Sequence, residues 1–213
     1  MPDRTLKPYT IGEEIANSIT HGIGILVSIV GLVFLIISAV TQGNAWHVVS
    51  FSIFGSTMIF LYLASTLYHS LPNPAVKMIF KQIDHSAIFL LIAGTYTPFT
   101  LIHLRGAWGW TIFGIIWVLA ISGIILKIFT ATRFKKLSLT LYILMGWLCV
   151  IAFKEMITKI PTLSLTLLMI GGFFYTTGVV FYIWKKLPYG HAIWHLFVLS
   201  GSAFHFFAVL YSV

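Results

Sequence analysis

Two histidines near the end of the chain, His191 and His195, are four residues apart. On a helix this spacing places both imidazoles on one face, one turn apart, as in helix-borne zinc sites. A third ligand must come from elsewhere, and His69 is the other histidine that lies well inside an apolar segment at a matching depth. Three neutral imidazoles with one open position suit Zn²⁺. A cysteine-based zinc cluster is excluded because Cys149 is the single cysteine.

Two polar residues accompany the histidines and are candidate catalytic groups. Ser65 precedes His69 by four residues, so its hydroxyl shares the helical face of that imidazole. Asp84 is the sole acidic residue within the predicted spans and would orient or deprotonate a water at the zinc. The alternatives stay open: Asp84 caps a helix, Ser65 bonds its own helical backbone, and the histidine pair supplies interfacial polarity.

The composition of the chain requires a membrane. Of 213 residues, 59% are hydrophobic and only 8% are charged, whereas a soluble domain carries about 45–50% apolar and about 25% charged residues. The formal net charge of +8 does not indicate nucleic-acid binding, because the thirteen Lys and Arg residues are scattered among apolar segments. The expected partners are membrane lipids.

Uninterrupted apolar length predicts an all-α, polytopic membrane protein with seven spans and a single domain over residues 1–213. Residues 1–19 are predicted to be a cytoplasmic N-terminal segment. Within it, Ile11, Ile15 and Ile19 recur every four residues, which favours a short interfacial helix before the first span. The predicted spans lie at 20–41, 47–69, 84–104, 108–127, 137–154, 162–184 and 190–212.

The distribution of Lys and Arg predicts the orientation. The N-terminus and the second, fourth and sixth loops carry ten basic residues, and the opposite side carries three. The positive-inside rule then places the N-terminus in the cytoplasm and, after seven spans, the C-terminus outside the cell membrane. In this orientation His69, Asp84, His191 and His195 all lie near the cytoplasmic face, although they are far apart in the sequence.

Other polar residues have weaker patterns. Glu13, Asn17 and His21 are spaced by four, which places them near one helical face. They are interpreted either as a hydrogen-bonded cluster that closes the cytoplasmic end of the bundle or as a gate or proton path above the zinc. His205 lies ten residues beyond His195, or about 15 Å along a helix. It is too distant for the same metal and is expected to be a buried, hydrogen-bonded histidine.

These residues fall into short motifs that resemble those of the PAQR/hemolysin III membrane proteins, a family that includes the adiponectin and progestin receptors. The resemblance covers essentially the whole chain and is greatest to the bacterial hemolysin III-like branch. It implies seven helices with a cytoplasmic N-terminus. The motifs are Glu13-x3-Asn17-x3-His21, Ser65-x3-His69, Asp84 within IDHSAI, and His191-x3-His195.

The resemblance also implies a zinc site. In the adiponectin receptors one histidine of the second helix and two of the seventh hold zinc, and the matching residues are His69, His191 and His195. The aspartate that holds the zinc-bound water there matches Asp84, and the motif serine matches Ser65. The family's relationship to alkaline ceramidases implies hydrolysis of a lipid amide. For the bacterial branch, the family implies haemolytic activity and a role in membrane homeostasis.

Three functions follow for comparison. The first is a zinc-dependent hydrolase that cleaves an amide or ester of a lipid within the helix bundle. The second is a non-catalytic sensor or regulator of membrane state, in which zinc joins the second and seventh helices. The third is a cytolysin, which would need a water-soluble form before insertion, and this composition does not allow one.

Overall fold

The computed structural model describes residues 9–130 and 134–213, which form helices and short connections without a strand. Seven helical stretches are long and apolar enough to cross a membrane, which confirms the predicted number of spans. The elements are α1 (Ile11–Gln42), α2 (Ala45–Ser70), α3 (Pro74–Pro98), the π-helical turn η1 (Phe99–His103), α4 (Ala107–Thr130), α5 (Lys135–Gly146), the 3₁₀ turn η2 (Leu148–Ala152), α6 (Phe153–Lys159), α7 (Thr162–Ile183) and α8 (Gly190–Leu210).

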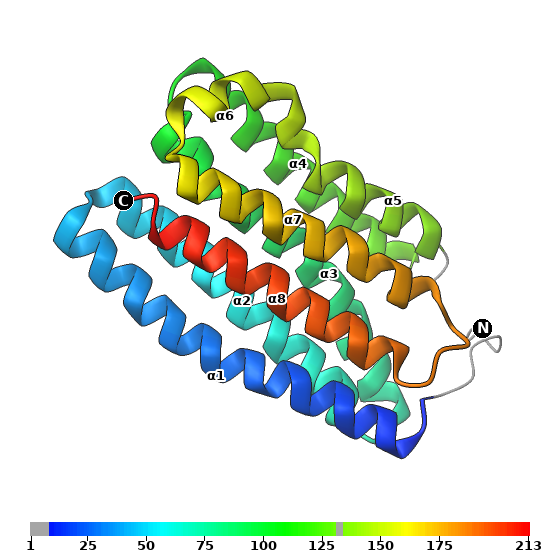
Figure 1. The fold of residues 1–213 in the computed structure, drawn as a ribbon. Helices are drawn as coiled ribbons and strands as arrows, with labels where there is room; N and C mark the ends of the chain where they lie inside the picture. Colours follow the sequence, from blue (N-terminus) through cyan, green and yellow to red (C-terminus); the bar gives the residue numbers. More distant parts are fainter. Residues whose placement is uncertain (1–8, 131–133) are drawn as a thin grey trace.

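The helices form a bundle in which α1 contacts both the second and the last helix (Figure 1). In addition, α2 packs on α3, α3 on α4, and α7 on α8. The start of α1 lies at the same end of the bundle as the α2–α3 and α7–α8 connections, and the C-terminus lies at the other end (Figure 1). We call the first of these the histidine end, because His69 lies at the end of α2 and His191 at the start of α8.

The first helix is continuous over 32 residues, so a separate interfacial helix before the first span is not shown. Thr10 starts α1 with a capping box: its hydroxyl accepts from the Glu13 backbone N–H at 3.3 Å, and the Glu13 carboxylate accepts from the Thr10 N–H at 2.8 Å. No proline follows within α1 to break the helix. The polar residues 11–18 are therefore the first turns of the spanning helix itself.

The third helix begins at Pro74, well before the predicted start at residue 84. Its cap is Asn73, whose side-chain oxygen accepts from the backbone N–H groups of Ala75 and Val76 at 3.0 and 3.3 Å. The prediction began too late because the first turns of α3 are polar and charged. Asp84 consequently lies inside α3, and the alternative that it caps the helix is wrong.

The fifth span is one membrane-length stretch made of α5, η2 and α6. Where the α-helix is interrupted, the hydroxyl of Tyr96 lies 2.8 Å from the carbonyl oxygen of Met145 and 3.0 Å from that of Gly146. The same oxygen accepts from the backbone N–H of Cys149 at 2.9 Å. In a bilayer, backbone groups that a break releases must find partners within the protein. Tyr96 of α3 supplies them here.

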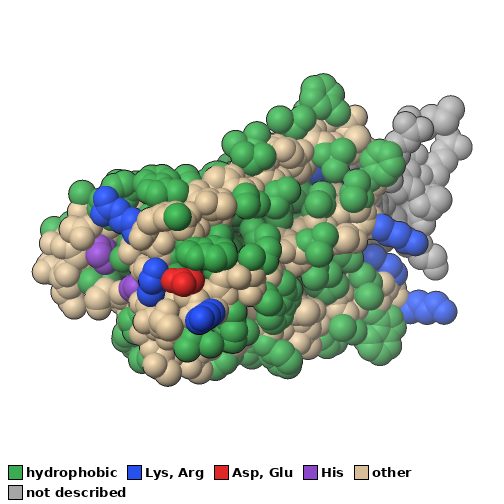
Figure 2. All heavy atoms as spheres, turned by 90° about the horizontal axis from the view of Figure 1, so that it is seen from above, with side chains coloured by type: hydrophobic (Ala, Val, Ile, Leu, Met, Phe, Trp, Pro, Cys, Tyr) green, Lys and Arg blue, Asp and Glu red, His purple; other side chains and the backbone are tan. Residues whose placement is uncertain are grey.

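The outer surface of the bundle is apolar, as a lipid-exposed surface must be. On the face drawn in Figure 2, the Lys, Arg, Asp and Glu side chains lie toward the two ends, and hydrophobic side chains cover the length between them. Large side chains such as Val27, Phe34 and Val118 are more than half exposed. Together with the seven membrane-length helices, this surface indicates a multi-pass membrane protein.

Gly109 in α4 marks a close approach to the backbone. A Cβ atom at Gly109 would lie 2.2 Å from the carbonyl oxygen of Thr100, whereas one at Gly114, in the same helix, would meet nothing within 4 Å. Because backbone cannot move aside as a side chain can, we expect Gly109→Ala to destabilise the protein by about 1–3 kcal/mol. Gly114→Ala should not destabilise it. Thermal unfolding of both variants checks this, and equal melting temperatures would contradict it.

Candidate metal centre

Three histidines from two helices meet at the histidine end of the bundle. One ring nitrogen of each of His69, His191 and His195 lies within 4.8 Å of the others. The ring centroids are 5.1 Å apart for His69 and His191, and 4.5 Å apart for His191 and His195. The His69 and His195 side chains are buried and His191 is half-buried. These residues, predicted from spacing and topology, thus form one cluster that could hold a metal ion.

The start of α1 organises the cluster because it packs on both helices that carry the histidines. Tyr189, directly before α8, has a positive φ of 54°, and its backbone N–H donates to the Glu13 carboxylate at 3.2 Å. This bond ties the start of α8 to the start of α1. His191 then follows in the first turn of α8, facing the last turn of α2.

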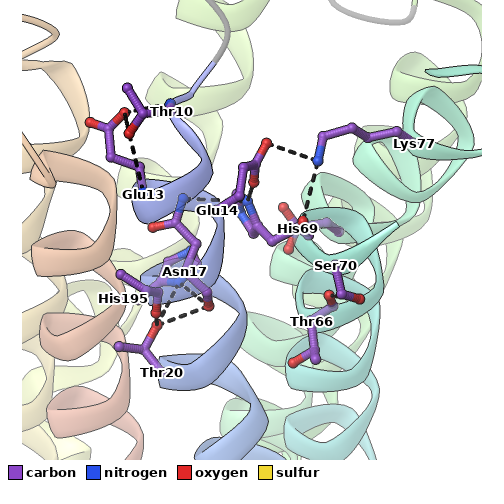
Figure 3. A network of polar contacts seen from close by, with 12 residues as sticks. Thr10, Glu13, Glu14, Asn17, Thr20, Thr66, His69, Ser70, Lys77 and His195 are labelled. Carbon is purple, nitrogen blue, oxygen red and sulfur yellow. Dashed lines mark hydrogen bonds and ion pairs between the residues drawn. The ribbon is translucent and has the colours of Figure 1, made fainter. Parts of the chain in front are cut away.

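His69 is oriented by an acidic residue of α1. Its Nδ1 lies 2.6 Å from the Glu14 carboxylate, whose other oxygen lies 2.8 Å from Nζ of Lys77 (Figure 3). A carboxylate accepts only, so Nδ1 of His69 carries the hydrogen and Nε2 keeps a free lone pair. Nε2 has no hydrogen-bond partner among the described residues. A carboxylate behind one ring nitrogen is the usual arrangement for a metal-binding histidine.

His195 is oriented in the same way by the next turn of α1. Its Nδ1 lies 3.2 Å from the carbonyl oxygen of Asn17 and 3.1 Å from the hydroxyl of Thr20 (Figure 3). A carbonyl accepts only, so Nδ1 carries the hydrogen and Nε2 is again the free nitrogen. The first helix therefore selects the same tautomer in His69 and His195.

The donor set fits a metal ion that binds imidazole. Both ring nitrogens of His191 and Nε2 of His69 are buried without a hydrogen-bond partner in the part of the chain that the structure describes. Buried polar atoms that lack a partner are costly, and bonds to a metal would satisfy one nitrogen of each ring. Three imidazoles with room for a fourth ligand are typical of Zn²⁺ sites that keep an open position.

Asp84 and Ser65 lie next to this cluster but are not part of it. Asp84 is buried and lines the same cavity as His191 and His195. The Ser65 hydroxyl faces the Asp84 carboxyl, and it makes no hydrogen bond of good geometry within the described residues. The alternative that Ser65 bonds its own helix is therefore wrong. The residues that could hold the metal are the three histidines, and Asp84 shares with two of them the lining of one cavity.

A cavity of about 180 Å³ is lined by two histidines of the cluster, His191 and His195. It lies between α3 and α5 on one side and α7 and α8 on the other, and the hydrogen bond from the Trp147 indole to the Thr176 hydroxyl, 3.1 Å, bridges the two sides. Apart from the groups at the histidine end and His205, its lining is mainly apolar. The apolar lining includes Leu61, Ile88, Leu91, Ile143, Leu168 and Val198.

The polar face of α1 differs from the prediction in one residue. Glu14, not Glu13, joins Asn17 and His21: the Asn17 amide lies 3.4 Å from Nδ1 of His69, and His21 stacks on His195 with ring centroids 3.5 Å apart. Spacings of three and then four residues keep side chains close to one helical face, whereas repeated spacings of four drift by about 40° per step. This periodicity could have identified Glu14.

Tyr9, directly before α1, covers the cluster and was missed by the sequence analysis. Its ring stacks on His191 with centroids 5.2 Å apart and lies 5.8 Å from the ring of His69. Burial raises the pKa of the Tyr9 phenol above its ordinary value, so the group stays neutral. No periodic pattern marks a residue that precedes a helix, so the sequence contains no signal for this contact.

The two neighbouring glutamates make a matched test. We expect Glu14→Ala to weaken zinc binding by about 10- to 100-fold, because His69 loses the carboxylate that holds its tautomer and orientation. Glu13→Ala removes the same charge one residue away, from a side chain that caps α1 and contacts the Tyr189 backbone but bonds none of the three histidines, so it should lower zinc affinity clearly less than Glu14→Ala does. Competition with a fluorescent zinc chelator measures both, and equal losses would show that Glu14 has no special role.

Comparisons with known proteins agree with this architecture. The family model described as Haemolysin-III related matches residues 9–206. The chain is 55% identical over 203 residues to "Hemolysin-3 homolog" of Bacillus subtilis (strain 168), covering 95% of both proteins, and 55% identical to "Hemolysin-3" of Bacillus cereus, covering 95% of this chain and 93% of that one. It is also 30% identical over 209 residues to the human "Monocyte to macrophage differentiation factor", covering 95% of this chain and 85% of that protein. The chain belongs to the haemolysin-III-related family of membrane proteins.

Proposed function

We propose that the protein is a zinc-dependent hydrolase that cleaves an amide or ester bond of a membrane lipid. One observation carries this proposal: three imidazoles with free nitrogens form a cluster, and two of them, His191 and His195, line an apolar cavity together with the buried carboxylic acid of Asp84. A zinc ion with a purely structural role would need only the three imidazoles. A cavity large enough for part of an acyl chain, with an acid at the metal end, is what hydrolysis of a lipid requires.

Each residue has a distinct task in this proposal. His69, His191 and His195 hold the zinc, which when bound acts as a Lewis acid toward a carbonyl oxygen and water. Asp84 takes the proton of the attacking water on its carboxylate and returns it to the leaving group. Ser65, whose hydroxyl faces that carboxyl, orients Asp84. Tyr9 stacks on His191 and keeps bulk water from the histidine end.

The lipid enters the cavity from the side of the bundle. The cavity is bounded by α5 and α7, which do not pack extensively against each other within the described residues. An acyl chain lying along the apolar lining would leave its carbonyl at the histidine end. The excess of basic residues at the N-terminus and even-numbered loops supports an orientation with that end, and residues 1–19, on the cytoplasmic side.

The direct experiment measures lipid turnover. Purified protein is loaded with zinc and incubated with a bacterial lipid extract, and free fatty acids are quantified by mass spectrometry. The matched control is His191→Ala, which removes a proposed zinc ligand. Release that requires both zinc and His191 supports the hydrolase. Equal release by the two proteins would assign it to a contaminant and overturn the proposal.

A regulator with a structural metal is the second candidate, and one observation favours it. The helices that carry the histidines, α2 and α8, each pack on α1 but do not pack extensively on each other in the described residues. A zinc ion would therefore join two helices that are otherwise joined mainly through α1. If no lipid in the extract is cleaved while zinc still stabilises the protein, this function takes precedence. Haemolysis, to which the names of the Bacillus relatives refer, would then arise from disturbance of the membrane.

A further inference from the structure

A further histidine lines the cavity, far from the histidine cluster. His205 of α8 is 8% exposed and lines the cavity. It lies ten residues beyond His195 on the same helix, which corresponds to about 15 Å along the axis. Between these two histidines, α8 contributes Val198 to the lining, and the lining residues Tyr175 and Thr176 have their hydroxyls in hydrogen bonds within the protein. A ligand that fills the cavity would thus meet histidines at two separate depths.

The hydrogen bond of His205 determines which of its nitrogens is free. Nε2 lies 3.0 Å from the carbonyl oxygen of Leu168 in α7. Since a carbonyl accepts only, Nε2 carries the hydrogen and donates it, and Nδ1 has a lone pair that can accept. This bond confirms that His205 is a buried, hydrogen-bonded histidine, but it uses only one of the two ring nitrogens.

Nδ1 of His205 is buried without any hydrogen-bond partner in the described residues. The ring is held by its opposite edge: a Cβ atom at Gly171 would lie 2.2 Å from Cδ2 and 2.6 Å from Nε2 of His205. The edge that contains Nδ1 therefore points away from Gly171 of α7. The nearby hydroxyls of Tyr175 and Ser202 bond each other at 2.6 Å, and neither makes a hydrogen bond to Nδ1. A buried acceptor without a donor is costly unless something else supplies one.

We propose that Nδ1 of His205 is a binding subsite that accepts a hydrogen bond from a hydroxyl group on the acyl chain of a lipid in the cavity. This inference rests on the proposed function only for the direction of the lipid, with its carbonyl at the histidine end. The spacing of the two polar levels selects hydroxylated chains whose hydroxyl lies near the middle of the chain. An unsubstituted chain leaves Nδ1 unsatisfied, and that difference is the basis of the selectivity.

Binding of two matched fatty acids tests the subsite without relying on catalysis. Ricinoleic acid differs from oleic acid by one mid-chain hydroxyl, and its O-methyl ether keeps the oxygen but cannot donate. Dissociation constants for the full-length protein in detergent are measured by native mass spectrometry. We expect ricinoleate to bind roughly fivefold to tenfold more tightly than oleate, the effect of one buried neutral hydrogen bond. The methyl ether should have no such advantage.

Two variants locate the preference. His205→Phe keeps a ring against Gly171 but removes the acceptor, so ricinoleate and oleate should bind equally. His191→Ala acts at the other end of the cavity, so it should weaken both ligands alike and leave their ratio unchanged. The ratio of the two dissociation constants can be measured even if the protein hydrolyses no lipid. Failure of the subsite can therefore be distinguished from failure of the proposed function.

Three outcomes would overturn the subsite. The first is equal binding of ricinoleate and oleate to the unmodified protein, and the second is equal binding of ricinoleate and its methyl ether. Both comparisons use the unmodified chain, so they stand even if His205→Phe fails to fold. The third is a preference for ricinoleate that survives in folded His205→Phe, which would place the hydroxyl at another group.

Discussion

Replacing His69, His191 or His195 with alanine is expected to abolish stoichiometric zinc binding and to lower the melting temperature substantially. Among the described residues, these three histidines form the group of side chains that could hold a metal. Because two imidazoles rarely suffice to bind zinc tightly, the loss of any one should be enough. With free zinc a thousandfold above its dissociation constant, binding adds about 4 kcal/mol to the stability of the folded state. For a chain of this size, losing that stability lowers the melting temperature by about 8–16 °C.

The measurement combines elemental analysis of the purified proteins with thermal unfolding in the presence and absence of a chelator. His47→Ala is the matched control, because His47 lies in the first turn of α2, at the opposite end of the helix from His69. The His47→Ala protein should retain zinc, and its melting temperature should still fall when the chelator removes the metal. If any of the three ligand variants keeps a full equivalent of zinc, the assignment of that ligand is wrong.

The second large effect concerns the acid beside the cluster. Asp84→Asn keeps the size of the side chain but removes its basicity, so lipid hydrolysis is expected to fall by about 10²- to 10⁴-fold. Zinc content should be unchanged, because Asp84 stands outside the group of potential ligands. This separation of turnover from metal content distinguishes Asp84 from the three histidines, whose loss should remove both.

Rates of fatty acid release and zinc content, measured on the same preparations, check this expectation. Ser65→Ala is informative beside it: if Ser65 orients Asp84, as proposed, its loss should lower the rate less than Asp84→Asn does. Full activity of Asp84→Asn with zinc bound would remove Asp84 from the mechanism. Loss of zinc from Asp84→Asn would instead indicate that the carboxylate contributes to holding the metal.

The number of spans and most of their bounds could be predicted from the sequence. The physical reason is that the bilayer imposes a minimum length of apolar chain, and this length is visible without any tertiary information. The same constraint makes ionisable residues inside spans conspicuous, which is why His69, His191, His195 and Asp84 could be singled out. Helical periodicity added that His191 and His195 share a face.

The starts of the first and third spans were predicted too late, because their polar first turns carry no apolar signal. The structure starts α3 at Pro74, with Asn73 as its cap, and so moves Asp84 from a helix terminus to a helix interior. It also shows α1 as one helix from Ile11. In both cases the capping side chain decides where the helix begins, and the hydropathy of the following residues does not.

The sequence by itself determined the class of the protein and the identity of the clustered histidines, since length, hydropathy and spacing are properties of the chain alone. Only the tertiary structure decided which groups support them. Glu14 rather than Glu13 contacts His69, Tyr9 stacks on His191, and His205 lines the cavity while one of its nitrogens is buried without a hydrogen-bond partner among the described residues. These contacts join residues of different helices, so they depend on how the helices rotate and pack against one another, which no local pattern encodes.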